Sequence, residues 1–131
     1  MSRDCLLDSS FVIDLLNETA AGRPGPAFRW LRRNRSARVW ISPVTYAETL
    51  EGADDVEAVR AHLRRYRWQG LQHARADLNA MLQRRVNKRL GENDAWQVAV
   101  ALHMKASLVG HDPRAFSRLG TLYEDHRARR G

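Results

Sequence analysis

The feature that most constrains the fold is the alternation of short apolar segments with stretches that favour helices. Segments rich in β-branched, aromatic or leucine residues lie at 5–7, 38–41 and 107–110, and a weaker one lies at 122–123. The spacing is generally too wide for hairpins, so we expect parallel strands joined by right-handed crossovers. The sequence therefore predicts an α/β fold, a three-layer α/β/α sandwich around a central, mostly parallel sheet.

The helices expected between the first two strands have clear start signals. Cap-type residues precede Phe11, where a helix should begin, and the glycines and prolines of 18–26 predict a loop. A basic helix should start at Pro26, with Phe28 and Leu31 on its apolar face.

Further helices are expected between the second and third strands. Ser42 offers an N-cap ahead of proline, and the helix that follows should place Val44, Ala47 and Leu50 on one face and end at Gly52. Ranges 54–67 and 74–90 predict an antiparallel helical pair around a turn at 68–70. Range 95–102 is apolar nearly all round and predicts a buried helix, and a short helix is expected at 115–116.

Length and composition favour one compact domain over residues 1–131. No apolar run reaches the roughly 18 residues that a membrane crossing needs, and the first residues lack a secretory signal, so we expect a cytoplasmic protein. Cys5 is the only cysteine, which excludes an internal disulfide, and its leucine neighbours favour a buried, inert thiol.

The chain carries a net charge of +7, and Lys88 and Lys105 are its only lysines. Arginine pairs with phosphate through two parallel hydrogen bonds, so this excess suits nucleic acid. A solvated, arginine-rich surface explains the composition too, and composition alone does not separate the two. Arg29, Arg32 and Arg33 are predicted to share one helical face, which either binds a partner or is simply solvated.

Carboxylates occupy the positions where functional side chains of parallel sheets are found. Asp8 follows the first strand, Asp112 follows the third, Glu48 lies about a turn and a half into the helix after the second, and Asp94 begins the buried helix. The carboxyl ends of parallel strands share one edge, so the four should meet there, with their repulsion relieved by cations or shared protons.

The donor set favours hard cations. Mg²⁺ and Mn²⁺ prefer oxygen ligands, whereas one cysteine and five scattered histidines fit zinc poorly. Two such cations activate water and stabilise the leaving oxygen of a phosphodiester, which is nuclease chemistry.

Each carboxylate also has a structural interpretation. Asp94 with Asn93 suits a helix cap, and Asp112 before Pro113 suits a turn. Glu48 lies inside a helix and is hardest to explain in that way.

Three neighbouring polar residues are less specific. Asp14 is expected on the solvent face of its helix, outside the site. Ser10 either caps that helix or orients Asp8 or a metal-bound water. His111 either contacts phosphate, shuttles a proton or lies on the surface beside a turn.

Four segments resemble the motifs of PIN domains, specifically VapC-type toxins of bacterial toxin–antitoxin pairs: 6–13, 41–52, 93–102 and 108–116. The resemblance implies a Mg²⁺- or Mn²⁺-dependent endoribonuclease with Asp8, Glu48, Asp94 and Asp112 as catalytic and metal-binding residues. It also implies an RNA substrate, a VapB-like antitoxin and a homodimer or toxin–antitoxin hetero-oligomer. The arginine face would then guide RNA or contact the antitoxin.

The chain departs from that pattern in two places. Gly110 and His111 stand where a threonine often precedes the last acidic position, and 54–90 has no distinctive signature. The first departure affects the geometry of the site, and the second leaves the choice of RNA open.

Two other functions are consistent with parts of the sequence. A noncatalytic nucleic-acid-binding module of the same fold is one, although a degraded site should have lost at least one of the four acids. A phosphoacceptor signalling domain is the other, but it needs an acidic pair after the first strand and a lysine late in the sheet. Here serines follow Asp8, and Lys105 precedes its strand.

Overall fold

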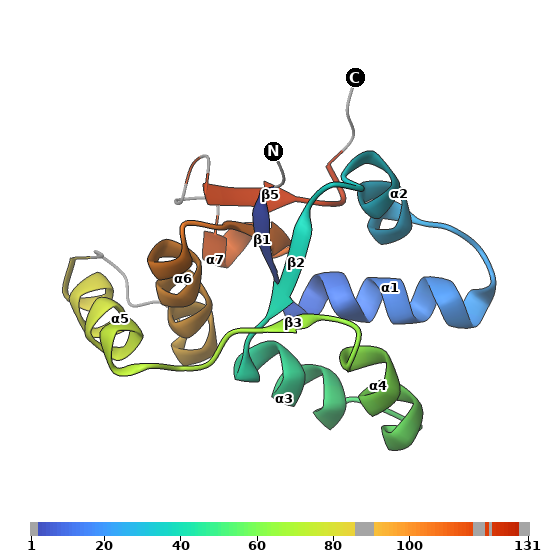
Figure 1. The fold of residues 1–131 in the computed structure, drawn as a ribbon, viewed down its shortest axis with the longest axis horizontal. Coiled ribbons are helices and arrows are strands. Elements are labelled where there is room, and N and C mark those ends of the chain that lie inside the picture. The colour runs from blue at the N-terminus through green and yellow to red at the C-terminus, as the bar shows by residue number, and fades with distance from the viewer. Residues whose placement is uncertain (1–2, 86–90, 117–119, 121, 129–131) are drawn as a thin grey trace.

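The computed structural model describes residues 3–85, 91–116, 120 and 122–128. Over these residues the chain forms one sheet in which every pair of neighbouring strands is parallel, in the order β3-β2-β1-β4-β5 (Figure 1). The strands are β1 Asp4–Leu7, β2 Arg38–Ile41, β3 Arg67–Trp68, β4 Ser107–Gly110 and β5 Tyr123–Asp125. The helices are α1 Ser9–Ala21, α2 Pro26–Arg33, α3 Pro43–Glu51, α4 Val56–Leu63, α5 His73–Arg85, α6 Glu92–Met104 and α7 Pro113–Phe116. The predicted parallel α/β/α architecture is confirmed.

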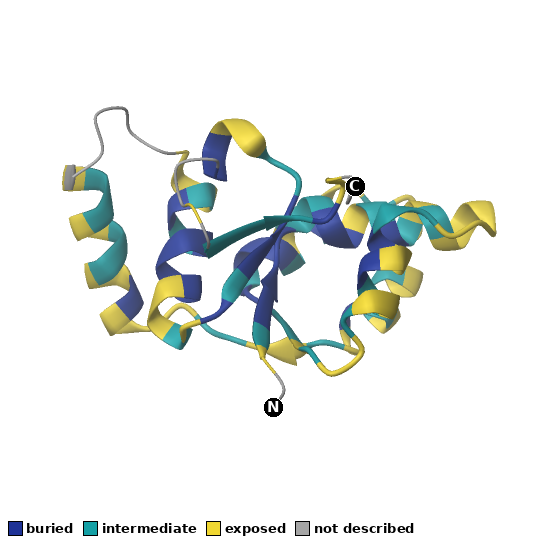
Figure 2. Ribbon diagram, turned by 90° about the horizontal axis from the view of Figure 1, so that it is seen from above, coloured by how far each residue is buried: buried dark blue, intermediate teal, exposed yellow. Residues whose placement is uncertain are grey.

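The two-residue period of β1 divides the core into two layers, because successive side chains of a strand point to opposite faces. Cys5 and Leu7 pack with residues of α1, α2 and α4, whereas Leu6 packs with residues of α6 and α7. Figure 2 shows the buried strands with helices on either side. Cys5 is fully buried as predicted, and burial raises its thiol pKa to about 11, which disfavours the reactive thiolate.

The loop predicted at 18–26 is shorter than expected, because α1 continues to Ala21 and ends at Gly22, whose φ of 67° is left-handed. The Glu18 carboxylate explains the extra turn. It accepts hydrogen bonds from the backbone N–H groups of Gly25, Ala27 and Phe28, so it caps the start of α2.

The apolar faces predicted for two helices are confirmed only in part, because Leu31 packs against the core and Val44 is buried, whereas Phe28 and Ala47 are exposed. In α2 the buried residues are Ala27 and Trp30, and Phe28 is 43% exposed. In α3 Ala47 is exposed, whereas Thr45 is buried because its hydroxyl donates to the carbonyl of Leu7 at 2.8 Å. A buried hydroxyl with a partner costs little, so an apolar pattern does not identify this face.

Both helices predicted within 54–90 are present, as α4 and α5, but their antiparallel pairing around a turn at 68–70 is wrong. α4 ends at Leu63, and the chain then adds the two-residue strand β3 beside β2, where the N–H of Gln69 donates to the carbonyl of Ile41. α5 packs against α6 on the other face of the sheet, and the predicted end of this pair, 86–90, lies outside the described residues. α6 is buried except on its outer side, where Leu102 is 44% exposed.

The last predicted strand, at 122–123, is present but lies slightly later, as β5. No helix within the described ranges is long and apolar enough to cross a membrane.

Candidate functional site

The four predicted carboxylates lie close enough to influence one another at the carboxyl edge of the sheet. Burial, followed by the charges of Asp112, Asp8 and Glu48, raises the pKa of Asp94 to about 6. Burial and the charge of Asp8 likewise raise the pKa of Glu48, against hydrogen bonds from Ser9 and Asn93. The structure therefore brings together all four residues.

Among the described residues, no arginine, lysine or histidine forms an ion pair with any of the four carboxylates. The edge is thus a concentration of uncompensated negative charge, which favours either a bound cation or a retained proton.

Asp8 is held by the first turn of α1. Its backbone N–H donates to the carbonyl of Val109 at 2.8 Å, and its Oδ2 accepts from the Ser10 hydroxyl at 2.7 Å and the Ser10 N–H at 3.3 Å. Asp8, not Ser10, is the N-cap of α1. The Ser10 hydroxyl in turn accepts the N–H of His111 at 2.8 Å, so Ser10 links the ends of β1 and β4.

Gly110 makes that link possible. A methyl group at this position would lie 2.6 Å from Cβ of Asp8 and 2.8 Å from Oγ of Ser10, closer than real side-chain contacts allow. Gly110, part of the departure from the family pattern, therefore allows the close approach of Asp8 and Ser10 to β4.

Sequence analysis missed Gln97, a fully buried side chain on α6. Its Oε1 accepts from the Ser42 hydroxyl at 2.6 Å, and its Nε2 lies 2.6 Å from Oγ1 of Thr45 and 3.4 Å from Oδ1 of Asp8. This network occupies the Ser42 hydroxyl, which makes no cap bond to α3. A single amide in the apolar run 95–102 was the signal available in the sequence.

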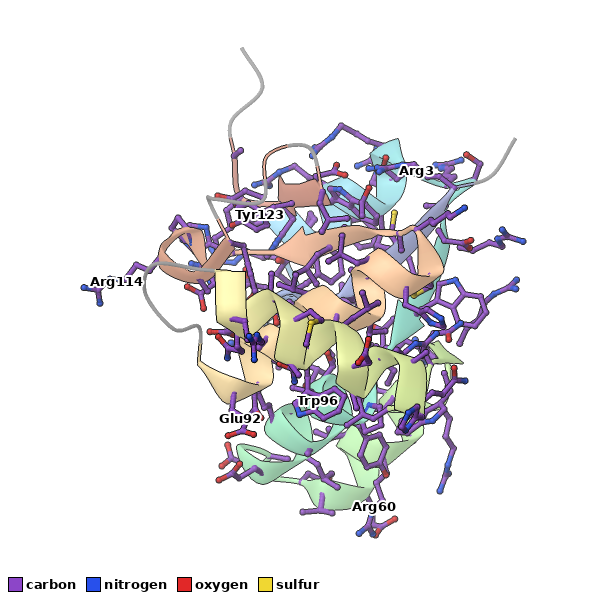
Figure 3. The ribbon with its side chains drawn as sticks, turned by 90° about the vertical axis from the view of Figure 1, so that its left-hand side faces the viewer. Arg3, Arg60, Glu92, Trp96, Arg114 and Tyr123 are labelled. Carbon is purple, nitrogen blue, oxygen red and sulfur yellow. The ribbon has the colours of Figure 1, made fainter. Side chains whose placement is uncertain are left out.

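The other carboxylates have local roles as well. Asp112 accepts the N–H of Ala115 at 3.2 Å, so it caps α7 as the structural interpretation predicted, and its own N–H donates to the Tyr123 hydroxyl. The Ser9 hydroxyl donates to Glu48 at 3.2 Å. Asp94 lies in the first turn of α6, and the N-cap position belongs to Gly91. Figure 3 shows Glu92 at this end of α6 and Tyr123 on β5.

His111 is partly exposed, and its Nδ1 lies 3.0 Å and 3.1 Å from the two carboxylate oxygens of Asp125. This pairing fixes the orientation of the ring beside Asp112. Contact of the ring with phosphate stays a prediction.

Asp14 does not point to solvent as predicted. Its carboxylate contacts Nε2 of the buried His126 at 2.7 Å and accepts two hydrogen bonds from Arg127, both 2.7 Å long. The His126 ring packs edge-on against Phe11. Asp14 thus fastens the segment after β5 to α1.

The donor chemistry of the site fits a hard divalent cation, because the cluster offers carboxylate oxygens and unbalanced negative charge. Within the described part of the chain, however, no three Asp, Glu, His or Cys side chains stand close enough to enclose a metal ion. Hydrogen bonds to Ser9, Ser10 and Ala115 instead hold individual oxygens of Glu48, Asp8 and Asp112.

A cluster of acids at the carboxyl edge of a parallel sheet defines a class of α/β domain. Comparison with known protein families shows which family this chain belongs to. The model of the PIN domain family matches residues 5–122, so the chain belongs to the PIN domain family. A search of curated proteins found no match.

Solved structures share the fold at low sequence identity. A toxin–antitoxin complex from Klebsiella pneumoniae has a TM-score of 0.78 and 19% identity, covering 93% of this chain and 97% of that chain. VapBC-1 from nontypeable Haemophilus influenzae has a TM-score of 0.72 and 22% identity, covering 95% and 99%. Mycobacterium tuberculosis VapC20, described as a sarcin–ricin loop cleaving toxin, has a TM-score of 0.65 and 20% identity, covering 89% and 95%.

Proposed function

We propose that this chain is a VapC-type toxin that hydrolyses RNA phosphodiester bonds with Mg²⁺ or Mn²⁺. The observation that carries the proposal is the meeting of Asp8, Glu48, Asp94 and Asp112 at one edge, where burial and neighbouring negative charges raise the pKa values of Asp94 and Glu48. Membership of the PIN family and the structural likeness to VapBC complexes support it.

Asp8 and Asp94, with Glu48 and Asp112, would hold the cation, which when bound supplies activation of water and stabilisation of the leaving oxygen. Ser10 keeps Asp8 oriented through its 2.7 Å hydrogen bond, and Gln97 supports Asp8 from the buried side. The carboxylates stand apart here, so a small rotation of their side chains toward a common centre belongs to the proposal.

The test is incubation of total RNA with the parent, with Asp94→Asn and with Asp8→Asn, each in Mn²⁺ and in EDTA. Asp77→Asn is the matched control, because Asp77 is exposed on α5. We expect metal-dependent cleavage by the parent and the control only. Equal cleavage by the site variants, or cleavage in EDTA, would overturn the proposal.

We also propose a VapB-like antitoxin as the partner, supported by the neighbouring structures, which are toxin–antitoxin complexes. A groove of about 560 Å³ lies between α1, α3 and α4, with Ile13 39% exposed along it. The buried Thr49 hydroxyl belongs to a residue that lines this groove, and it has no hydrogen-bond partner among the residues that the structure describes. A peptide segment with an apolar side chain and a carbonyl group suits such a lining.

Co-expression with the protein encoded by the neighbouring gene tests the groove. Ile13→Asp should lose the complex, whereas Leu71→Asp, which adds the same charge at an exposed leucine, should keep it. Equal co-purification of both variants would place the antitoxin elsewhere. The assembly state implied by the resemblance is measured on the same samples by light scattering.

A further inference from the structure

Four arginines form a charged hollow on the surface, away from the carboxylates. Arg29, Arg32, Arg33 and Arg35 line a cavity of about 360 Å³, and all four are exposed. None of their guanidinium groups has an ion pair or hydrogen bond with another residue in the described ranges, unlike Arg3 and Arg38 nearby, which pair with Glu124 and Asp4.

Helix electrostatics do not account for this group. Arg32 and Arg33 lie in the last turn of α2, where a cation interacts favourably with the helix dipole. Arg29 precedes that turn and Arg35 follows the helix, so neither gains much from the dipole. Four unpaired like charges around one hollow repel one another, and a bound polyanion would relieve that repulsion.

The hollow lies at the opposite edge of the sheet from the acids. Asn34, between Arg33 and Arg35, accepts a hydrogen bond from Arg3 at 2.9 Å, and Arg3 directly precedes β1. Figure 3 shows Arg3 near the top of the molecule and Glu92, two residues before Asp94, at its lower left. β1 has four residues, so the two edges are separated by roughly 13 Å along the strands.

We propose that this arginine hollow is a second anion site, which binds backbone phosphates of an RNA whose scissile segment lies at the acidic edge. The inference rests on the proposed function and adds to it a phosphate-binding surface at the edge of the sheet opposite the acids. The acidic cluster repels a polyanion, so affinity must come from cations elsewhere, and guanidinium groups match phosphate oxygens in pairs. A strand spanning about 13 Å needs at least roughly four nucleotides at 3.4 Å each.

The experiment measures binding without cleavage, in EDTA, by fluorescence anisotropy across a range of salt concentrations. Bulk transfer RNA is the long probe, an RNA dinucleotide, which is too short to span the two edges, is the short probe, and polyglutamate is the acidic peptide probe. The test variant replaces all four arginines of the hollow by glutamine. The control replaces the exposed Arg23, Arg64, Arg65 and Arg84 by glutamine, which changes the net charge equally.

For transfer RNA, the slope of log affinity against log salt should become shallower by about 3 in the test variant, from four contacts of roughly 0.7 to 0.9 each. The control should keep most of the parent slope, and the short probe should not distinguish the two variants. If the salt slope falls equally in both variants, net charge alone explains the change and the proposal is overturned. Loss of polyglutamate binding alone would overturn it in favour of an acidic protein partner.

Cleavage of the short probe in Mn²⁺ separates this inference from the proposed function. If the parent cuts it and the hollow has no effect on transfer RNA binding, the second site fails while the nuclease stands. If no probe is cut yet the salt slope changes, the hollow binds RNA and the catalytic proposal fails.

Discussion

Replacing Asp94 by asparagine should stabilise the metal-free protein at neutral pH, although it should abolish catalysis. Burial and the charges of Asp112, Asp8 and Glu48 raise the pKa of Asp94 from 3.8 to about 6. The folded state therefore binds the proton more tightly than the unfolded chain does. Stability falls as pH rises from about 4 to about 6, and the cost persists above that range.

The magnitude follows from the shift. A difference of about 2 pKa units corresponds to about 3 kcal/mol, and solvent screening at this partly exposed carboxylate reduces it to about 1.5 kcal/mol. Asp94 also lies in the first turn of α6, where its charge favours the helix dipole by about 0.5 kcal/mol. The net gain for Asp94→Asn is then about 1 kcal/mol, or about 4 °C in Tm for a chain of this length.

Thermal unfolding in EDTA at pH 5 and pH 7.5 measures this effect. The contribution of Asp94 should make the Tm of the parent higher at pH 5 than at pH 7.5. At pH 7.5 the Tm of Asp94→Asn should exceed that of the parent, and it should depend less on pH. Asp77→Asn should follow the parent. Added Mn²⁺ should raise the parent Tm and reverse the order, because only the parent binds the ion well. A variant less stable than the parent at pH 7.5 in EDTA would refute the mutual repulsion on which the site depends.

Three further changes test the surroundings of the site. Gly110→Ala should displace Asp8, which should cost about 1–3 kcal/mol of stability in an unfolding experiment. It should also remove most of the Mn²⁺ affinity measured by calorimetry, and normal Mn²⁺ binding would contradict the close approach. Gln97→Leu should cost about 2–4 kcal/mol in chemical denaturation, because it leaves buried hydroxyls unpaired, and an unchanged midpoint would exclude the network. Asp14→Ala should cost about 2–3 kcal/mol at pH 7; hydrogen bonds from Arg127 and His126 lower the pKa of Asp14, so this cost should shrink as pH falls below about 4, and a pH-independent loss would count against it.

The parallel sheet and the four acids were predictable because their signals are local. β1, β2 and β4 are short segments with apolar residues, and Asp8 and Asp112 come shortly after β1 and β4, where parallel topology gathers side chains. Glu48 and Asp94 follow from the same topology, because Asp94 lies in the first turn of α6 and Glu48 about a turn and a half into α3.

The supporting residues were not predictable from the same patterns, since their roles depend on contacts across the chain. Gln97 meets Asp8 across 89 positions, and Ser10 meets His111 across 101. β3 has two residues between helix-forming stretches and gains its structure from pairing with β2. Short helices such as α2, with eight residues, contain too few periods for apolar spacing to define a face.

β5 connects the acidic edge with α1 and α2. Although its sequence gives only a weak strand pattern, its residues hold Asp112 and His111 in place. Its Tyr123 receives the N–H of Asp112, and its Asp125 orients His111. The strand is held in turn by Glu124, which accepts from Trp30 of α2 at 2.7 Å, and by the contact of Asp14 with the segment that follows it. The position of Asp112 therefore depends on contacts made by α1 and α2, well outside the acidic edge.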